Sequence, residues 1–208
     1  MKTVAHQRKD PDILPPSTEL SALVNTYTAL ATKKLLDHLP NEALAAINQA
    51  HILCSNSTNS QDEKSLVDCT TLNTEACVLK AIGRPHMAIA ALKRALNSLG
   101  EIKSEDIAVN AARCRTLINL SGVLSSVNQH EASLKHAAMA VRILTRNKSA
   151  SDDTGLLIAA YFNLGTEYEH LRRLPEAAES YRRCSSLADE EHPLWSLVQK
   201  ALTEIGNK

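Results

Sequence analysis

Apolar and small residues recur along the chain at the spacing of amphipathic helices that come in pairs. The clearest pair runs from Ala159 to Leu187, where large apolar and small side chains follow one another in a definite order. Its positions are Tyr161, Leu164, Gly165, Tyr168, Ala177, Tyr181 and Cys184. Small residues let two helices approach closely, and large ones fill the space between them. The segment therefore predicts a packed helical hairpin.

The same order of residues returns when the chain is followed back by 44 residues and then twice by 45. One small position holds Ala177, Ser133, Ala88 and Ala43, and another holds Cys184, Ala140, Ala95 and Ala50. Pro40, Pro85 and Pro175 stand near the predicted start of the second helix in three copies, where a missing N–H costs little. The pattern predicts four hairpins, each of which buries its apolar side against its neighbours.

The residues of the last copy resemble a tetratricopeptide repeat. The period of 44 to 45 residues exceeds the usual length of about 34 and is similar to the long-repeat class of kinesin light chains. The resemblance implies an all-α fold: a right-handed α-solenoid of four tetratricopeptide-like helical hairpins plus a C-terminal capping helix.

We expect one solenoid domain over residues 18–206, preceded by a flexible leader of residues 1–17 that is rich in proline and charge. The expected copies span about residues 18–56, 62–100, 104–147 and 152–189, and the cap spans residues 193–206. The cap carries a broad apolar stripe, and we expect Trp195 within it to be largely buried.

Composition removes several classes of function. Lys plus Arg and Asp plus Glu both total 23 and aromatic residues are 3%, so nothing favours nucleic acid as a partner. No apolar run reaches the length of a signal peptide or of a membrane span. The five cysteines form no CxxC pair and lie within helical patterns, where we expect them to be unreactive. We predict no catalytic residue, no metal site and no cofactor, and a cytoplasmic location, with the cytoskeleton or a cilium as a further option.

Two charged residues depart from the apolar pattern. Lys34 takes a position that Leu79, Leu124 and Tyr168 fill in the other copies, and Glu75 takes one filled by Leu30, Leu120 and Leu164. Two interpretations stay open: an ion pair between the two side chains, or a locally shifted register in which both reach water.

The resemblance also implies a concave groove, lined by the first helix of each hairpin, that binds a peptide or helix of a partner protein. Asn119 and Asn163 occupy the same position in consecutive copies, and their amides could hydrogen-bond a peptide backbone or, alternatively, only the neighbouring helix or water. The predicted peptide-binding residues are Asn73, Lys80, Arg115, Asn119, Asn163, Thr166, Glu169 and His170.

We therefore predict a non-catalytic protein–protein interaction module, a scaffold or adaptor. The alternative is a structural subunit of a cytoskeletal or ciliary assembly that uses its convex face or its ends. An enzyme or redox sensor that uses a cysteine has less support, because no cysteine lies in a recognisable reactive setting. The partner and the oligomeric state are left open by the sequence.

Overall fold

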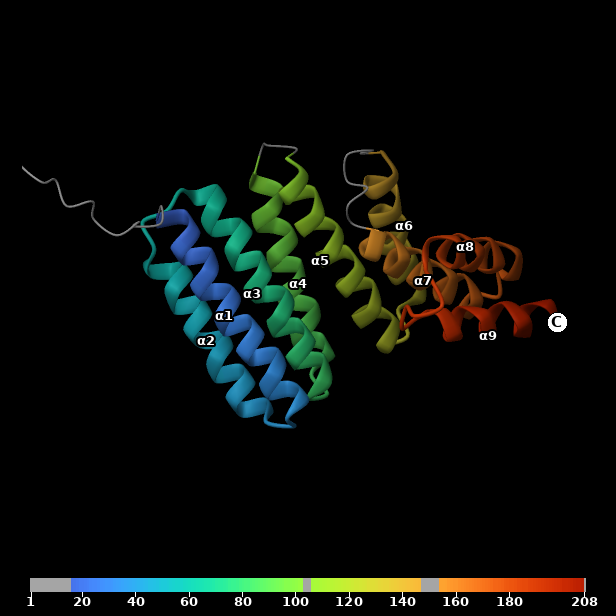
Figure 1. Cartoon of the computed structure of the whole chain (residues 1–208), viewed down its shortest axis with the longest axis horizontal. Helices are drawn as coiled ribbons and strands as arrows, with labels where there is room; N and C mark the ends of the chain where they lie inside the picture. Colours follow the sequence, from blue (N-terminus) through green and yellow to red (C-terminus); the bar gives the residue numbers. More distant parts are fainter. Residues whose placement is uncertain (1–15, 103–105, 147–153, 208) are drawn as a thin grey trace, which may run out of the picture.

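The computed structural model describes residues 16–102, 106–146 and 154–207, which form nine α-helices and no strand (Figure 1). The first eight helices pair into four hairpins, and the ninth follows at the C-terminal end. Their bounds are α1 Pro16–Leu36, α2 Pro40–Asn56, α3 Gln61–Ala81, α4 Pro85–Glu101, α5 Ile107–Ser126, α6 His130–Arg146, α7 Thr154–His170, α8 Leu174–Leu187 and α9 Trp195–Gly206. The expected fold class, an α-solenoid of four hairpins with a C-terminal helix, is confirmed.

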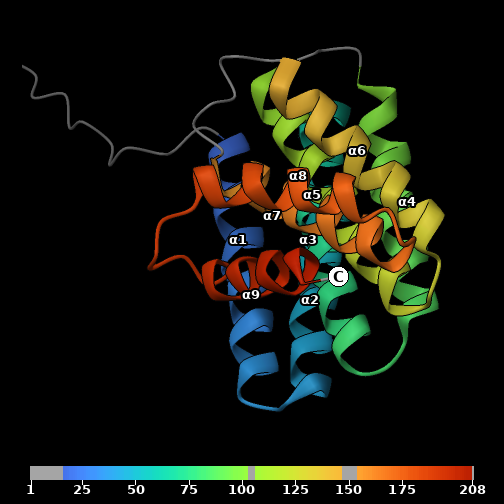
Figure 2. The same ribbon diagram turned by 90° about the vertical axis from the view of Figure 1, so that its right-hand side faces the viewer.

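The hairpins stack in chain order from α1 and α2 at one end to α8 and α9 at the other (Figure 1), and Figure 2 shows the array from its C-terminal end. Each first helix packs against its own second helix, and α3, α5 and α7 also pack against both helices of the preceding hairpin. The first helices α1, α3, α5 and α7 are consequently neighbours in space, although they are separated along the chain. None of the helices described combines the length and the apolar character that a membrane crossing requires.

The four hairpin turns share the same backbone geometry, residue by residue. Each turn has one residue with a left-handed backbone: His38 (φ 59°), Gly83 (φ 76°), Asn128 (φ 60°) and Arg172 (φ 61°). In each case the next residue donates its N–H to a carbonyl of the last helical turn at 2.8 to 3.0 Å, as from Arg84 to Leu79 and from Arg173 to Tyr168. Pro40, Pro85 and Pro175 then lie in the first turn of α2, α4 and α8, as predicted.

The small positions predicted from the repeat lie in the core. Ala43, Ala88, Ser133 and Ala177 are all fully buried, and so are Ala50, Ala95, Ala140 and Cys184. Ser133, the polar member, satisfies its hydroxyl by donating to the carbonyl of Ser121 at 2.8 Å. Ser121 itself replaces an alanine of the first two copies, so the two serines occur together in the third hairpin.

The C-terminal helix packs on the fourth hairpin, as predicted. Helix α9 begins at Trp195, and its fully buried side chain is Val198, with Ala201, Leu202 and Ile205 beside it. Most of Trp195 is buried, as expected, whereas Leu197 of the same stripe is 51% exposed. Only one side of α9 is covered by α8, which leaves the rest of its apolar stripe in contact with solvent.

The predicted domain limits stay a prediction. Residues 1–15 of the predicted leader, and the link residues 103–105 and 147–153, lie outside the described residues.

Candidate binding groove

Three neighbouring depressions run along the surface formed by α1, α3, α5 and α7, with volumes of about 240, 240 and 230 Å³. The first and second lie between α1, α3 and α5 and share Thr70, Asn73 and Arg115. The second and third share Cys77 and Asn119, and the third extends to Asn163 on α7. Because neighbouring depressions have lining residues in common, we treat them as one surface, the first-helix groove.

The structure brings five of the eight predicted site residues into this groove: Asn73, Lys80, Arg115, Asn119 and Asn163. The other three, Thr166, Glu169 and His170, do not line these three depressions. The hydroxyl of Tyr181 lies 3.3 Å from both Thr166 Oγ1 and Glu169 Oε2, and the His170 ring stacks on that of His130 with the centroids 4.2 Å apart. These three residues therefore make contacts within the fourth hairpin and to the start of α6.

The asparagine amides join neighbouring first helices. Asn119 Nδ2 donates to Asn73 Oδ1 at 2.7 Å, and Asn163 Nδ2 donates to the carbonyl of Ile118 at 3.1 Å. Asn73, which is buried, donates in turn to Thr116 Oγ1 at 2.8 Å. These N–H groups therefore bond a neighbouring helix, which is the alternative to peptide binding that the sequence left open. The Oδ1 atoms of Asn119 and Asn163 accept no hydrogen bond from any residue that the structure describes.

The charged residues that line the groove are all positive. Arg115 and Lys80 are the charged residues that line the three depressions, and both are exposed cations. Lys80 Nζ donates to the carbonyl of Gly122 at 3.1 Å, whereas Arg115 forms no ion pair within the described ranges. Helix α5, at the centre of the groove, contains two arginines and no acidic residue. In a chain of zero net charge, the groove is therefore locally positive.

The cysteines differ from one another in exposure. Cys54, Cys69, Cys114 and Cys184 are buried, whereas Cys77 is exposed in the groove. Burial raises the pKa of the Cys69 thiol, and it raises the pKa of Cys184 to about 11. Thiols with raised pKa values are protonated at neutral pH and make poor nucleophiles.

Comparison with known proteins agrees with this architecture. The sequence model of the tetratricopeptide repeat family matches residues 158–191, which include most of α7 and all of α8. The chain contains a tetratricopeptide repeat and has the fold of a tetratricopeptide-like solenoid. No curated protein matches the chain in sequence.

Solved structures with this fold share little sequence with the chain. BtubC (BKLC) from P. vanneervenii is 16% identical with a TM-score of 0.74, over 91% of this chain and 74% of that one. A putative kinesin light chain from Podosopora anserina with nearly identical TPR-like repeats is 16% identical with a TM-score of 0.66, over 94% and 88%. The apo form of RapI is 14% identical with a TM-score of 0.71, over 88% of this chain. The chain spans 63% of the length of RapI.

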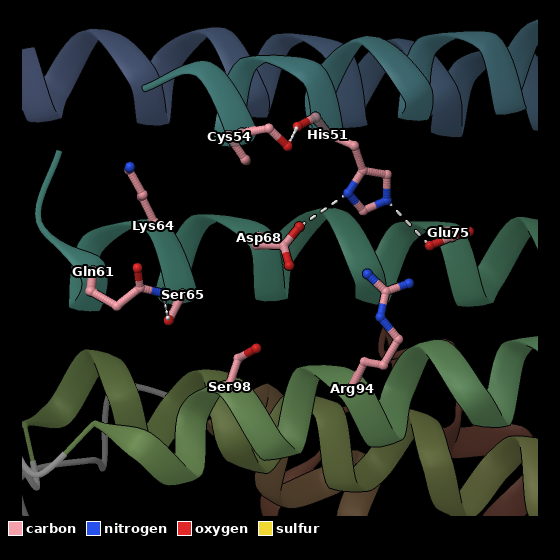
Figure 3. Close-up of a pocket in the computed structure, with 10 residues that line it drawn as sticks. His51, Cys54, Gln61, Lys64, Ser65, Asp68, Glu75, Arg94 and Ser98 are labelled. Carbon is pink, nitrogen blue, oxygen red and sulfur yellow. Dashed lines mark hydrogen bonds and ion pairs between the residues drawn. The ribbon is translucent and has the colours of Figure 1, made fainter. Parts of the chain in front are cut away.

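A second cavity of about 390 Å³ lies away from the groove, between α2, α3 and α4 of the tetratricopeptide-like array (Figure 3). His51 of α2 points at α3, with Nδ1 3.0 Å from Asp68 Oδ1 and Nε2 3.2 Å from Glu75 Oε2. Hydrogen bonds to these two carboxylates, Asp68 first, raise the pKa of His51 to about 9. Its imidazolium therefore links the first hairpin to the second at neutral pH.

This contact corrects the interpretation of Lys34 and Glu75 as a pair. Glu75 bonds His51, while Lys34 Nζ lies 2.6 Å from Glu42 Oε2 within the first hairpin. No role for His51 was predicted from the sequence. The signal was available in Glu75, because an acid in an otherwise apolar position implies a partner on the helix that packs over it.

A second histidine–carboxylate contact was also missed by sequence reasoning. Glu167 of α7 is 1% exposed, and its Oε2 lies 2.9 Å from His130 Nδ1 at the start of α6. Val78 and Val123, both buried, fill the equivalent position in the second and third copies. A charged residue thus takes a core position, and the described contact for its carboxylate is a histidine from the preceding hairpin.

We predict that the link through His51 weakens in alkaline solution. The pKa of His51 is higher in the folded chain (about 9) than its ordinary value of 6.5, so its contribution to stability is complete below pH 6.5 and is lost as the pH rises through about 9. Partial exposure of the cluster reduces the expected loss to about 1 to 2 kcal/mol. Urea denaturation on either side of this window measures it.

The His51→Gln variant should lack this pH-dependent loss, whereas His86→Gln, a change at an exposed histidine of α4, should retain it. Equal pH dependence in the wild type and His51→Gln would contradict the role assigned to His51.

Proposed function

We propose that the chain is a non-catalytic protein–protein interaction module that binds an extended segment of a partner protein in the first-helix groove. The observation that supports this most directly is the continuity of the groove, in which three depressions share their lining residues across α1, α3, α5 and α7. Solenoids of stacked repeats generally use such extended surfaces for binding, and tetratricopeptide-like repeats generally mediate protein–protein interaction.

The chemistry of the groove favours a segment that carries an acidic side chain. Arg115 offers a planar fork of donors without an internal carboxylate partner in the described part of the chain, and Lys80 adds a second positive charge one depression further along. The Oδ1 atoms of Asn119 and Asn163 are available to accept N–H groups from a peptide backbone. The apolar floor of the third depression, Ala76, Ile118 and Val123, suits a small apolar side chain between these polar contacts.

We predict that reversing the charge of Arg115 weakens peptide binding. Synthetic peptides of equal length with acidic, neutral or basic side chains are titrated against the wild type and Arg115→Glu by fluorescence anisotropy. Acidic peptides should bind best, and Arg115→Glu should weaken their binding by about tenfold or more, because a charge-assisted hydrogen bond becomes a repulsion. Arg115 is preferable to Asn119 as a target because the Asn119 amide also joins two helices.

Arg142→Glu is the matched control, because Arg142 is an exposed arginine on α6, outside the groove, and undergoes the same change of charge. Its binding should equal that of the wild type. Equal weakening by both variants would indicate a non-specific effect of net charge. Undiminished binding by Arg115→Glu would contradict the groove and favour the alternative of a structural subunit that uses its convex face or its ends.

A further inference from the structure

One side of α1 carries an exposed apolar stripe at the N-terminal end of the array. Leu23 is 49% exposed and Leu30 is 39% exposed, and Thr26, which lies between them on the same side of the helix, is exposed as well. Glu19 precedes these residues by one helical turn and Lys33 follows them by one turn, and both are exposed. We call Glu19, Leu23, Thr26, Leu30 and Lys33 the α1 outer stripe.

Two of these positions, those of Thr26 and Leu30, are covered by the preceding hairpin in the later copies. Thr71, Thr116 and Ala160, which correspond to Thr26, are all fully buried. Leu120 and Leu164, which correspond to Leu30, are buried as well, and Glu75 bonds His51 of the preceding second helix. The reason is that α3, α5 and α7 each pack under the second helix of the preceding hairpin. Among the described helices, α1 packs against α2 and α3. Its outer stripe therefore carries residue types that are buried in the later hairpins, but no described helix lies over it.

The stripe is complementary to itself. A two-fold axis perpendicular to α1, midway between Thr26 and Tyr27, places Leu23 level with Leu30 of a second copy, because 23 and 30 are equally far from that point. The same axis places Glu19 level with Lys34 of the second copy and beside its Lys33. Lys34 is already paired with Glu42, so Lys33 is the cation that remains for Glu19. The two leucines thus meet at the centre, and opposite charges meet at both ends.

We propose that two copies of the chain associate through their α1 outer stripes, with the two α1 helices antiparallel. This pairing buries the leucines of the stripe and places each stripe charge beside an opposite charge. A partner helix without this order of residues would not do both. The groove stays open in such a dimer, because Ser21, Asn25 and Thr32 line it from another side of α1. A dimer would carry two grooves and could hold two segments of one partner, which raises the apparent affinity without a new contact.

A single pair of helices makes a small interface, so we expect a dissociation constant in the micromolar range and a visible change with concentration. Sedimentation velocity of the full chain over a concentration series measures it. Leu23→Asp should raise the dissociation constant by more than about tenfold, because it places a charge in the apolar centre of the contact. Leu197→Asp is the matched control, since Leu197 is as exposed as Leu23 but lies on α9 at the opposite end of the array.

Charge-reversal variants of Glu19 and Lys33 distinguish this antiparallel dimer from other modes of association. Glu19→Lys and Lys33→Glu should each weaken the dimer about threefold to tenfold, because each creates two like-charge contacts across the two-fold axis. The double variant should restore the wild-type dissociation constant, a result that unfolding of α1 cannot produce. A chain that stays monomeric at every concentration would overturn the proposal and assign the stripe to another segment or partner. A dimer weakened by Leu197→Asp but not by Leu23→Asp would overturn it as well.

Discussion

Replacement of His130 by alanine is expected to lower the free energy of unfolding by about 3 kcal/mol, the largest loss that we predict for a single substitution. The variant removes the side chain 2.9 Å from Glu167 Oε2 and leaves a carboxylate that is 1% exposed without that partner. A buried charge that loses its partner keeps the full cost of its desolvation. The loss also includes the stacking of His130 on His170. Chemical denaturation of both proteins at neutral pH measures the difference.

The equivalent valines of the second and third hairpins provide the control. Glu167→Val gives the fourth hairpin the residue type of Val78 and Val123, so we expect it to change stability by less than about 1 kcal/mol. In the Glu167→Val background, His130→Ala should cost much less than in the wild type, because no buried carboxylate remains. An equal cost in both backgrounds would show that the histidine stabilises the fold through its ring contacts and not through the carboxylate.

The second large effect is expected at Gly165 of α7, which packs against the Tyr181 ring of α8. A Cβ atom at this position would lie 2.7 Å from both Cδ1 and Cε1 of Tyr181, whose side chain is buried and whose hydroxyl bonds Thr166 and Glu169. We expect Gly165→Ala to cost about 2 kcal/mol, because the strain of overpacking exceeds the gain of about 1 kcal/mol in helix propensity. Thermal and chemical denaturation measure this cost.

The repeat itself suggests the compensating change. The second hairpin has Ala76 and Leu92 where the fourth has Gly165 and Tyr181, and both residues of that pair are buried. The double variant Gly165→Ala with Tyr181→Leu should therefore be more stable than the sum of the two single changes predicts, by about 1 to 2 kcal/mol. Gly122→Ala is the control, because a Cβ there would meet no atom closer than 3.9 Å. Additive single changes would contradict a steric origin.

Sequence reasoning identified the helices and their pairing because the packing of each hairpin repeats. A small residue must stand wherever two helices approach closely, and this requirement recurs every 44 to 45 residues. The buried positions from Ala43 to Ala177 and the prolines at the starts of three second helices were predictable for this reason. The polar face of the first helices was predictable in the same way, and five of the eight predicted site residues line the groove.

The partners of individual polar residues were not predictable from spacing. Lys34 and Glu75 are both exceptions to the apolar pattern, yet the first bonds Glu42 and the second bonds His51. Which atoms meet depends on the rotation and the offset of neighbouring helices, and these follow from packing over the whole interface.

The sequence by itself thus determined the four hairpins, their small core positions and five of the residues that line the groove, because these depend on contacts that every repeat makes in the same way. Only the tertiary structure decided which carboxylate meets which histidine, which asparagine atoms stay available to a ligand and which side of α1 is left uncovered. Those properties arise where one hairpin meets the next or where the array ends, and there the geometry is set by helices that are distant along the chain.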